Sequence, residues 1–384
     1  MKFGLYSQVM DPTRERVFGD VLDELKTQVV LCEEAGFHCV WVDEHHFNTG
    51  FNCSTNPLLV GAMLASHTKR IRIGQTDVVG CWQPLRLAED VALLDHLSRG
   101  RVDVGIGRGI RPFDMRNLNP QLGDIWPNPG ANFDPKQQID SREHFAEVLQ
   151  ILQKAWTEEF FSHEGTYYKF PQSGVSLKSA VPSSDSAMVM DGARATMRLA
   201  PTPYQKPYPP LWLLMTSEPS FAEAAQLGLN GLVWIQPPKR LKQRLKIYSD
   251  ARTVREGRHV KVGEDIGILR LVYVAPSYEE AKRDADQFFT PHYQEACKTR
   301  PASYWSDGSE SEARNVDLDW EFLRDQLLIL AGSPEQVVEQ IQQLKDISGT
   351  DYIILWTEAR GMSHKKIMSS LELFATKVAP LFAD

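Results

Sequence analysis

Residues 84–109 read PLRLAEDVALLDHLSRGRVDVGIGRG, and this stretch predicts a helix followed directly by a strand. Pro84 is tolerated in the first helical turn. Apolar residues then recur at helical spacing, at Leu87, Val91, Leu94 and Leu97. The helix is expected to stop at 98–100, and residues 101–107 alternate as a half-buried strand does. The stretch is therefore one helix–strand step of an α/β fold.

The same alternation runs along most of the chain. We expect eight strands, each followed by a helix. The strands are expected at 3–7, 38–42, 71–73, 101–107, 211–215, 231–235, 266–274 and 351–356. Eight such units favour a closed (β/α)8 TIM barrel. A doubly wound sheet is the alternative, but no glycine fingerprint follows the first strand, and residues 105–110 miss GxGxxG at the last position.

The composition disfavours several classes of protein. The 384 residues carry 42 basic and 50 acidic side chains, and a net charge of -8 argues against a broad nucleic-acid or membrane surface. The N-terminus lacks the apolar segment of a signal peptide, and no stretch has the length of a membrane span. The five cysteines include no CxxC pair. We therefore expect a cytoplasmic enzyme with reduced thiols.

Long polar segments interrupt the alternation. Residues 110–135 contain five prolines, and residues 298–320 are polar. Residues 159–210 are rich in Ser, Pro and Tyr, and one hairpin is expected around Tyr167-Tyr168. Loops of this length in a compact domain are usually functional lids or disordered segments. We expect one barrel domain over residues 1–384, with insertions near 110–135 and 159–210.

The densest polar cluster, Asp43-Glu44-His45-His46-Phe47, ends the second predicted strand. Barrel enzymes carry their chemistry at the carboxyl ends of strands. A single histidine here would favour a structural role, but two histidines with two carboxylates favour a functional site. A transition metal suits these ligands. However, adjacent side chains of a strand face opposite sides, so we expect no metal.

Two other strand ends carry hydrogen-bond donors for an anion. Arg108 follows the glycine-rich fourth strand and offers a planar set of N–H groups. Thr216, Ser217 and Ser220 lie where a helix begins after the fifth strand. Taken alone, Arg108 is equally well explained as an exposed arginine in a glycine-rich turn, and the segment 216–220 is better explained as an ordinary helix cap. Together they suggest a phosphorylated cofactor, and Trp234 at the end of the sixth strand faces a planar ring or belongs to the core.

Several segments carry a resemblance to a known family, and they lie at 1–4, 33–47, 94–109, 332–335 and 349–351. In this order and spacing they make the chain similar to the bacterial luciferase family of flavin-dependent monooxygenases, over nearly its whole length. The match at 43–47 includes the Glu44-His45-His46-Phe47 motif. Gly107 stands where the light-emitting members have a reactive cysteine, which argues against bioluminescence.

The resemblance implies roles for individual residues. His45 matches the family histidine that acts beside the flavin C4a position, and Glu44 would hold its tautomer or be structural. A non-proline cis peptide bond of the family would fall at Thr76-Asp77, beside the cofactor. The flavin phosphate would be bound by Arg108, Thr216, Ser217 and Ser220, with Trp234 beside the isoalloxazine ring.

The function implied by the resemblance is that of a two-component monooxygenase. It would use reduced FMN and O2, through a C4a-(hydro)peroxyflavin, to oxygenate a small organic substrate. Since one barrel leaves no room for an NAD(P)H domain, a separate reductase would supply the flavin. Residues 283–320 would form a mobile lid, and the chain would be a homodimer. The alternatives are an F420-dependent hydride-transfer enzyme, a non-catalytic flavin-binding protein and a metal-dependent hydrolase.

Overall fold

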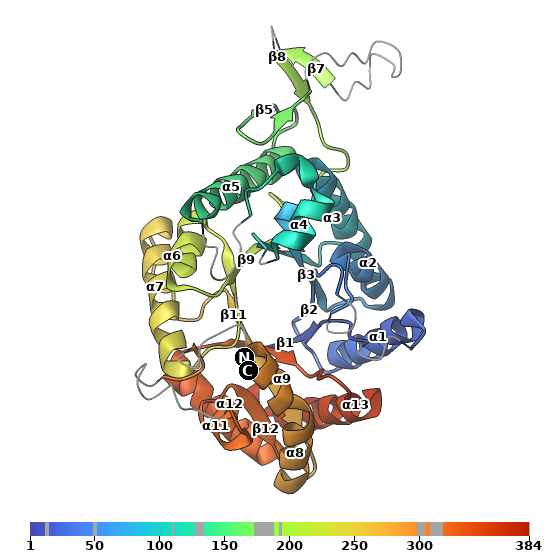
Figure 1. Ribbon diagram of the computed structural model, residues 1–384, viewed down its shortest axis with the longest axis vertical. Coiled ribbons are helices and arrows are strands. Elements are labelled where there is room, and N and C mark those ends of the chain that lie inside the picture. Colours follow the sequence, from blue (N-terminus) through green and yellow to red (C-terminus); the bar gives the residue numbers. More distant parts are fainter. Residues whose placement is uncertain are drawn as a thin grey trace. The chain divides into compact units, whose positions relative to one another are not determined.

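The structure of the chain is a computed structural model (Figure 1). The described residues are 1–11, 15–48, 52–109, 111–126, 134–172, 188–191, 194–297, 304–307 and 318–383. The chain divides into two compact units, of which one is Met1–Gln75 with Leu211–Asp384 and the other is Thr76–Pro210. Parts of the predicted insertions and of the predicted lid, including residues 298–303 and 308–317, lie outside the described residues.

The main sheet contains the predicted barrel. Its barrel strands are β1 (Lys2–Ser7), β2 (Cys39–Asp43), β3 (Arg72–Val78), β4 (Val102–Gly107), β9 (Leu211–Met215), β10 (Asn230–Val233), β11 (Ile266–Val274) and β13 (Tyr352–Trp356). The strand order is β10-β9-β4-β3-β2-β1-β13-β11, and β10 also pairs with β11, which closes the sheet. The predicted (β/α)8 TIM barrel is confirmed.

One strand of the first unit was not predicted. β12 (Ile329–Gly332) pairs in parallel with the end of β11, and Leu271 is the register partner of Ile329. All four β12 residues are buried. An apolar run of four residues is too short to be told from a buried helical turn by periodicity alone.

Most helices of the first unit follow the predicted pattern, but residues 285–297, which were expected to belong to the mobile lid, are helical. The helices of this unit are α1 (Phe18–Glu34), α2 (Pro57–His67), α6 (Glu218–Leu227), α7 (Pro238–Glu256), α8 (Tyr278–Asp284), α9 (Thr290–Cys297), α11 (Trp320–Asp325), α12 (Pro334–Ser348) and α13 (His364–Leu373). α12 illustrates the residues that mark the two ends of a helix. At its start Ser333 N donates to Gln336 Oε1 at 3.0 Å, and at its end Gly349 has a φ of 78°. No helix in the described ranges is both long and apolar enough to span a membrane.

The second unit holds both predicted insertions. Its elements are α3 (Pro84–Ser98), β4, α4 (Pro112–Leu118), α5 (Pro135–Thr157), β5 (His163–Glu164), β6 (Lys169–Phe170), β7 (Met188–Asp191) and β8 (Arg194–Met197). The last four strands form two antiparallel pairs. Glu147 of α5 anchors the β5–β6 turn, because its carboxylate accepts from the backbone N–H groups of Thr166 (2.9 Å) and Tyr168 (2.8 Å). The β5–β6 pair confirms the hairpin expected around Tyr167-Tyr168, whereas α4 and the β7–β8 pair lie in segments that were interpreted as loops.

Large aromatic side chains pack in the first unit. Trp41 of β2 donates from Nε1 to the hydroxyl of Tyr352 at 2.8 Å, and its ring centroid lies 5.3 Å from that of Trp212. Gly74 makes room for this packing, because a Cβ there would overlap the ring of Trp41. Since protein interiors are close-packed, these contacts fix the strands that present the site.

Candidate functional site

The site begins at Asp43, the last residue of β2, where a fully buried strand ends. The Asp43 carboxylate accepts a hydrogen bond from Asn52 Nδ2 at 2.5 Å and a short one from the hydroxyl of Tyr6. Burial, and then repulsion by Asp43, raise the pKa of Tyr6 well above its usual value. Tyr6 therefore remains protonated and donates to a carboxylate that is held in place from two sides.

His45 lies beside this carboxylate. Its Nε2 atom is 3.5 Å from Asp43 Oδ2, and its backbone N–H donates to Ser54 O at 2.9 Å. The side chain of His45 is 24 % exposed, so the imidazole has a fixed partner on one side and remains accessible on another. This arrangement suits a histidine that exchanges a proton with a bound molecule.

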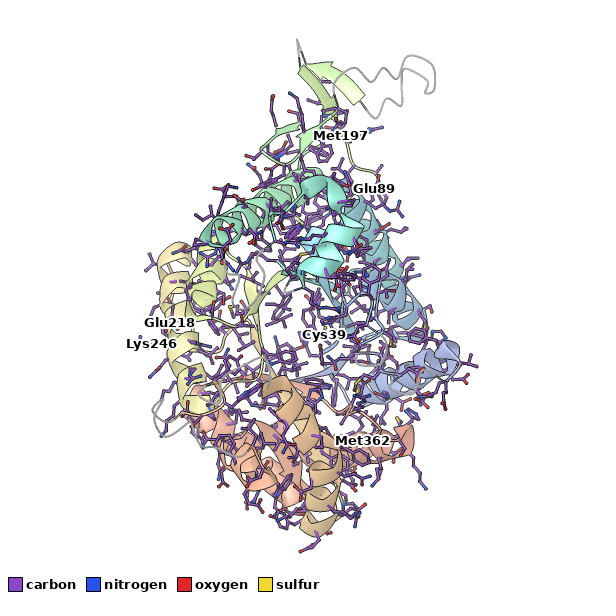
Figure 2. The ribbon with its side chains drawn as sticks, viewed as in Figure 1. Cys39, Glu89, Met197, Glu218, Lys246 and Met362 are labelled. Carbon is purple, nitrogen blue, oxygen red and sulfur yellow. The ribbon has the colours of Figure 1, made fainter. Side chains whose placement is uncertain are left out.

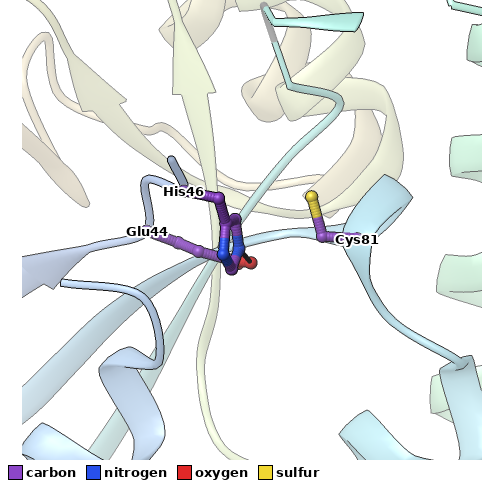
Figure 3. Close-up of side chains that lie close together, drawn as sticks. All are labelled: Glu44, His46 and Cys81. Atoms are coloured by element: carbon purple, nitrogen blue, oxygen red, sulfur yellow. Dashed lines mark hydrogen bonds and ion pairs between the residues drawn. The ribbon is translucent and has the colours of Figure 1, made fainter. Parts of the chain in front are cut away.

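Glu44 contacts His46, the second histidine of the 43–47 cluster. Its Oε1 atom lies 2.5 Å from Nε2 of His46, and the Glu44 side chain is fully buried (Figure 3). Glu44 therefore pairs with His46, and the expectation that it holds the tautomer of His45 stays a prediction beside the structural alternative. Asp43 thus meets His45, and Glu44 meets His46.

A second carboxyl group lies close to the ends of β1 and β13. Glu358 accepts from Ser7 Oγ at 2.7 Å and from the backbone N–H of Gln8 at 3.1 Å. Burial raises the pKa of Glu358 to about 7, and Asp43 contributes to the same direction. The group also lines a cavity of about 380 Å³.

Aromatic rings surround the partly buried Trp234, which follows β10. The ring centroid of Trp234 lies 5.4 Å from that of Trp356 and 6.5 Å from that of Tyr6. His292 of α9 packs edge-on against Trp356 at 4.6 Å, and burial lowers the pKa of His292 to about 4. Trp234 therefore shares an aromatic cluster with Tyr6, the residue that holds Asp43.

The predicted phosphate residues Thr216, Ser217 and Ser220 lie at the start of α6. Ser220 Oγ donates to Ser217 O at 2.5 Å and accepts from Ser217 N at 3.3 Å. Arg244 of α7 reaches the same place, because its Nη1 donates to Thr216 O at 3.0 Å. The donor set suits a phosphate, which needs N–H and O–H groups and positive charge.

The remaining predicted residues belong to the second unit. Thr76 and Asp77 are buried near the end of β3, and Arg108 directly follows β4 and is half-buried. The cis peptide bonds of the described residues precede Pro171, Pro201 and Pro207. The prediction of a cis bond at Thr76-Asp77 is therefore wrong, and β3 continues through these residues to Val78.

Sequence reasoning missed Tyr6, Asn52, Arg244 and Glu358. Glu358 could have been found from its position two residues after the last barrel strand, by the rule that drew attention to the 43–47 cluster. Tyr6, Asn52 and Arg244 carry no such signal, because only the fold shows which groups they contact.

A family model described as luciferase-like monooxygenase matches residues 1–351 of the chain. The chain belongs to this family. The predicted membership, and with it the prediction of an enzyme of the flavin-dependent monooxygenase class, is confirmed.

Individual relatives agree with this assignment. The oxygenase component of a flavin-dependent trigonelline monooxygenase from Acinetobacter baylyi is 24 % identical over 392 residues, which cover 100 % of this chain and 96 % of that protein. Among solved structures, the oxygenating constituent of 3,6-diketocamphane monooxygenase from Pseudomonas putida, a type II Baeyer-Villiger monooxygenase in complex with FMN, has a TM-score of 0.73. It is 22 % identical and covers 99 % of this chain and 98 % of its own.

The fold is also shared with enzymes of another cofactor. An F420-dependent secondary alcohol dehydrogenase has a TM-score of 0.64, is 16 % identical, and covers 100 % of this chain and 99 % of its own. Because identities of this size show the fold alone, the choice between FMN and F420 depends on the site.

Proposed function

We propose that the chain is the oxygenase component of a two-component monooxygenase. It takes reduced FMN from a separate NAD(P)H:flavin reductase and uses O2 to oxygenate a small organic molecule. The observation that carries the proposal is the imidazole of His45, held beside Asp43 at the carboxyl end of β2 and still partly exposed. Within one barrel, such a position is where reacting groups gather.

The residues around His45 have separate tasks. Asp43 lies at Nε2 of His45, so it favours the tautomer that carries its proton on that atom and leaves Nδ1 to accept or return a proton. Tyr6 and Asn52 fix the carboxylate that does this. Reduced FMN, when bound, supplies the electrons that activate O2.

The cofactor would be held by groups from several strand ends. Thr216, Ser217 and Ser220 would bind its phosphate, and Trp234 would contact its ring system. Thr76, Asp77 and Arg108 of the second unit are assigned to the same cofactor by the family resemblance. Water exclusion by aromatic side chains such as Trp356 and Tyr6 would protect the reaction from a wasteful release of hydrogen peroxide.

An anaerobic titration tests the proposal against its rival. We expect the protein to bind reduced FMN at micromolar concentration or below, and more tightly than it binds F420. The surface variant His259→Asn, which changes an exposed histidine, serves as the matched control and should bind FMN as the wild type does. Preferential binding of F420 would favour the hydride-transfer enzyme, and binding of neither would overturn both.

A further inference from the structure

The cavity that Glu358 lines, of about 380 Å³, lies within the first unit. It is formed by residues that follow β1, by α1, and by the segment that leads from β13 into α13. Figure 2 labels one of the lining residues, Met362, which stands just ahead of α13 in the chain. Small-molecule sites have volumes of about 300–1,000 Å³, so this cavity is large enough to be one. Its described lining residues include none of those assigned to the flavin.

Much of the cavity lining is apolar. Val21 and Leu25 of α1 and Ile367 of α13 are buried residues that line it. Met10 and Met362 add flexible thioether side chains, which adapt to irregular shapes and make favourable contacts with aromatic rings. The cavity can therefore hold the apolar body of a small molecule.

Gln28 of α1 lines the same cavity and carries a polar atom without a partner. The residue is 3 % exposed, and its Nε2 atom donates to Nδ1 of His364 at 3.4 Å. Its Oε1 atom is buried and accepts no hydrogen bond. Natural proteins rarely keep a buried acceptor in this state unless a ligand or a water molecule satisfies it. Gln28 therefore points to a ligand that donates a hydrogen bond.

Glu358 is a second acceptor in the cavity. Its two oxygens each accept one hydrogen bond, from Ser7 Oγ at 2.7 Å and from the backbone N–H of Gln8 at 3.1 Å, whereas a carboxylate can accept about four. Glu24 lines the cavity too, but Nη2 of Arg16 lies 2.6 Å from its Oε1 atom and offsets its charge. Among the described lining residues, Glu358 is thus the carboxyl group without an ion-pair partner.

The surroundings of Glu358 favour a cation as its partner. Burial raises the pKa of Glu358, and the negative charges of Asp43 and Glu24 act in the same direction. A bound anion would add to this repulsion, whereas an ammonium group would offset it. An ammonium group also has three N–H donors, which are enough for both Glu358 and Gln28.

We propose that this cavity binds a small primary amine with an apolar body. The ammonium group donates to the carboxylate of Glu358 and to Oε1 of Gln28. The apolar body packs against the side chains of α1 and α13 and against the two methionines. This second ligand site goes beyond the proposed function and does not depend on it.

The test compares three probes of similar size, 2-phenylethylamine, 2-phenylethanol and 3-phenylpropionate, each titrated into the full chain at pH 8. NMR of the methionine methyl groups follows the titrations and locates each probe, because Met10 and Met362 line the cavity and Met215 of β9 is buried elsewhere. We expect the amine to shift the signals of Met10 and Met362. It should bind about tenfold more tightly, or better, than the alcohol or the acid.

Two variants each remove one acceptor. Glu358→Gln should weaken binding of the amine by about tenfold or more and leave binding of the alcohol within about twofold of the wild type. Gln28→Leu should weaken binding of the amine by about three- to tenfold. The matched control is Glu372→Gln, an exposed change on α13 that removes the same charge, and it should bind all three probes as the wild type does.

Equal affinities of the wild type for the amine and the alcohol would overturn the proposal. Unchanged binding of the amine by Glu358→Gln would overturn it as well. So would a titration with the amine that shifts the signal of Met215 and leaves those of Met10 and Met362 in place.

Discussion

Nε2 of His45 lies 3.5 Å from Oδ2 of Asp43, and the same carboxylate is held by Tyr6 and Asn52. His45 therefore has an oriented neighbour, and that neighbour is the residue two positions before it in the chain. A carboxylate at one ring nitrogen favours the tautomer with its proton on that nitrogen.

The first prediction concerns this tautomer. In the wild type at pH 8, we expect the His45 proton on Nε2, because Asp43 faces that atom. Asp43→Ala should give a mixture of the two tautomers. Long-range 1H–15N NMR of the imidazole checks this without any cofactor, with His259 as an internal reference. An unchanged Nε2–H signal in Asp43→Ala would contradict the positioning role.

The second prediction concerns stability against pH. The pKa of Glu358 is raised to about 7 in the folded protein, whereas an unfolded glutamate titrates near 4.3. Between these values the folded state binds more protons, so this group lowers the free energy of unfolding as pH rises from about 4 to about 7. Glu358→Gln removes the titration. We therefore expect the variant to gain stability relative to the wild type between pH 5 and pH 8.

Between pH 5 and pH 8, the free energy of unfolding of Glu358→Gln relative to the wild type should rise by close to, and no more than, about 3 kcal/mol. Urea unfolding at the two pH values measures it. A difference between variant and wild type that stays constant from pH 5 to pH 8 would show that Glu358 does not titrate in this range.

The third prediction concerns the packing beneath the site. Gly74→Ala would place a methyl group in the ring of Trp41 and should cost about 1–3 kcal/mol in the free energy of unfolding. Gly19→Ala, in the first turn of α1, meets only Val17 at 4.0 Å and should be neutral or slightly stabilising. Denaturant unfolding of both variants checks the contrast, and equal effects would mean that Trp41 moves aside freely.

The fold was largely predictable because its signals are local. Strands at 211–215 and 266–274 match β9 and β11 to the residue, since apolar runs bounded by breakers mark them. β12 was missed because four apolar residues carry no period. α4 was missed because prolines were interpreted as loop residues, although Pro112 opens that helix.

The site was predictable only in part. The 43–47 cluster stood out by its composition, and Trp234 by its place at a strand end. The partners could not be predicted, because Ser7 and Glu358, or Thr216 and Arg244, are brought together by folding and by nothing in their spacing. The pairing of Glu44 with His46 could not be predicted either, because both residues follow the end of β2, where strand alternation no longer applies.

The central claim is that His45 controls how reduced FMN reacts with O2. The direct measurement is stopped-flow mixing of the anaerobic protein–FMN complex with O2, followed by flavin absorbance. We predict a slow phase of reoxidation in the wild type and in His259→Asn, and a phase at least tenfold faster in His45→Asn. Reoxidation of the wild-type complex at the rate of free reduced FMN, or an unchanged slow phase in His45→Asn, would contradict the account.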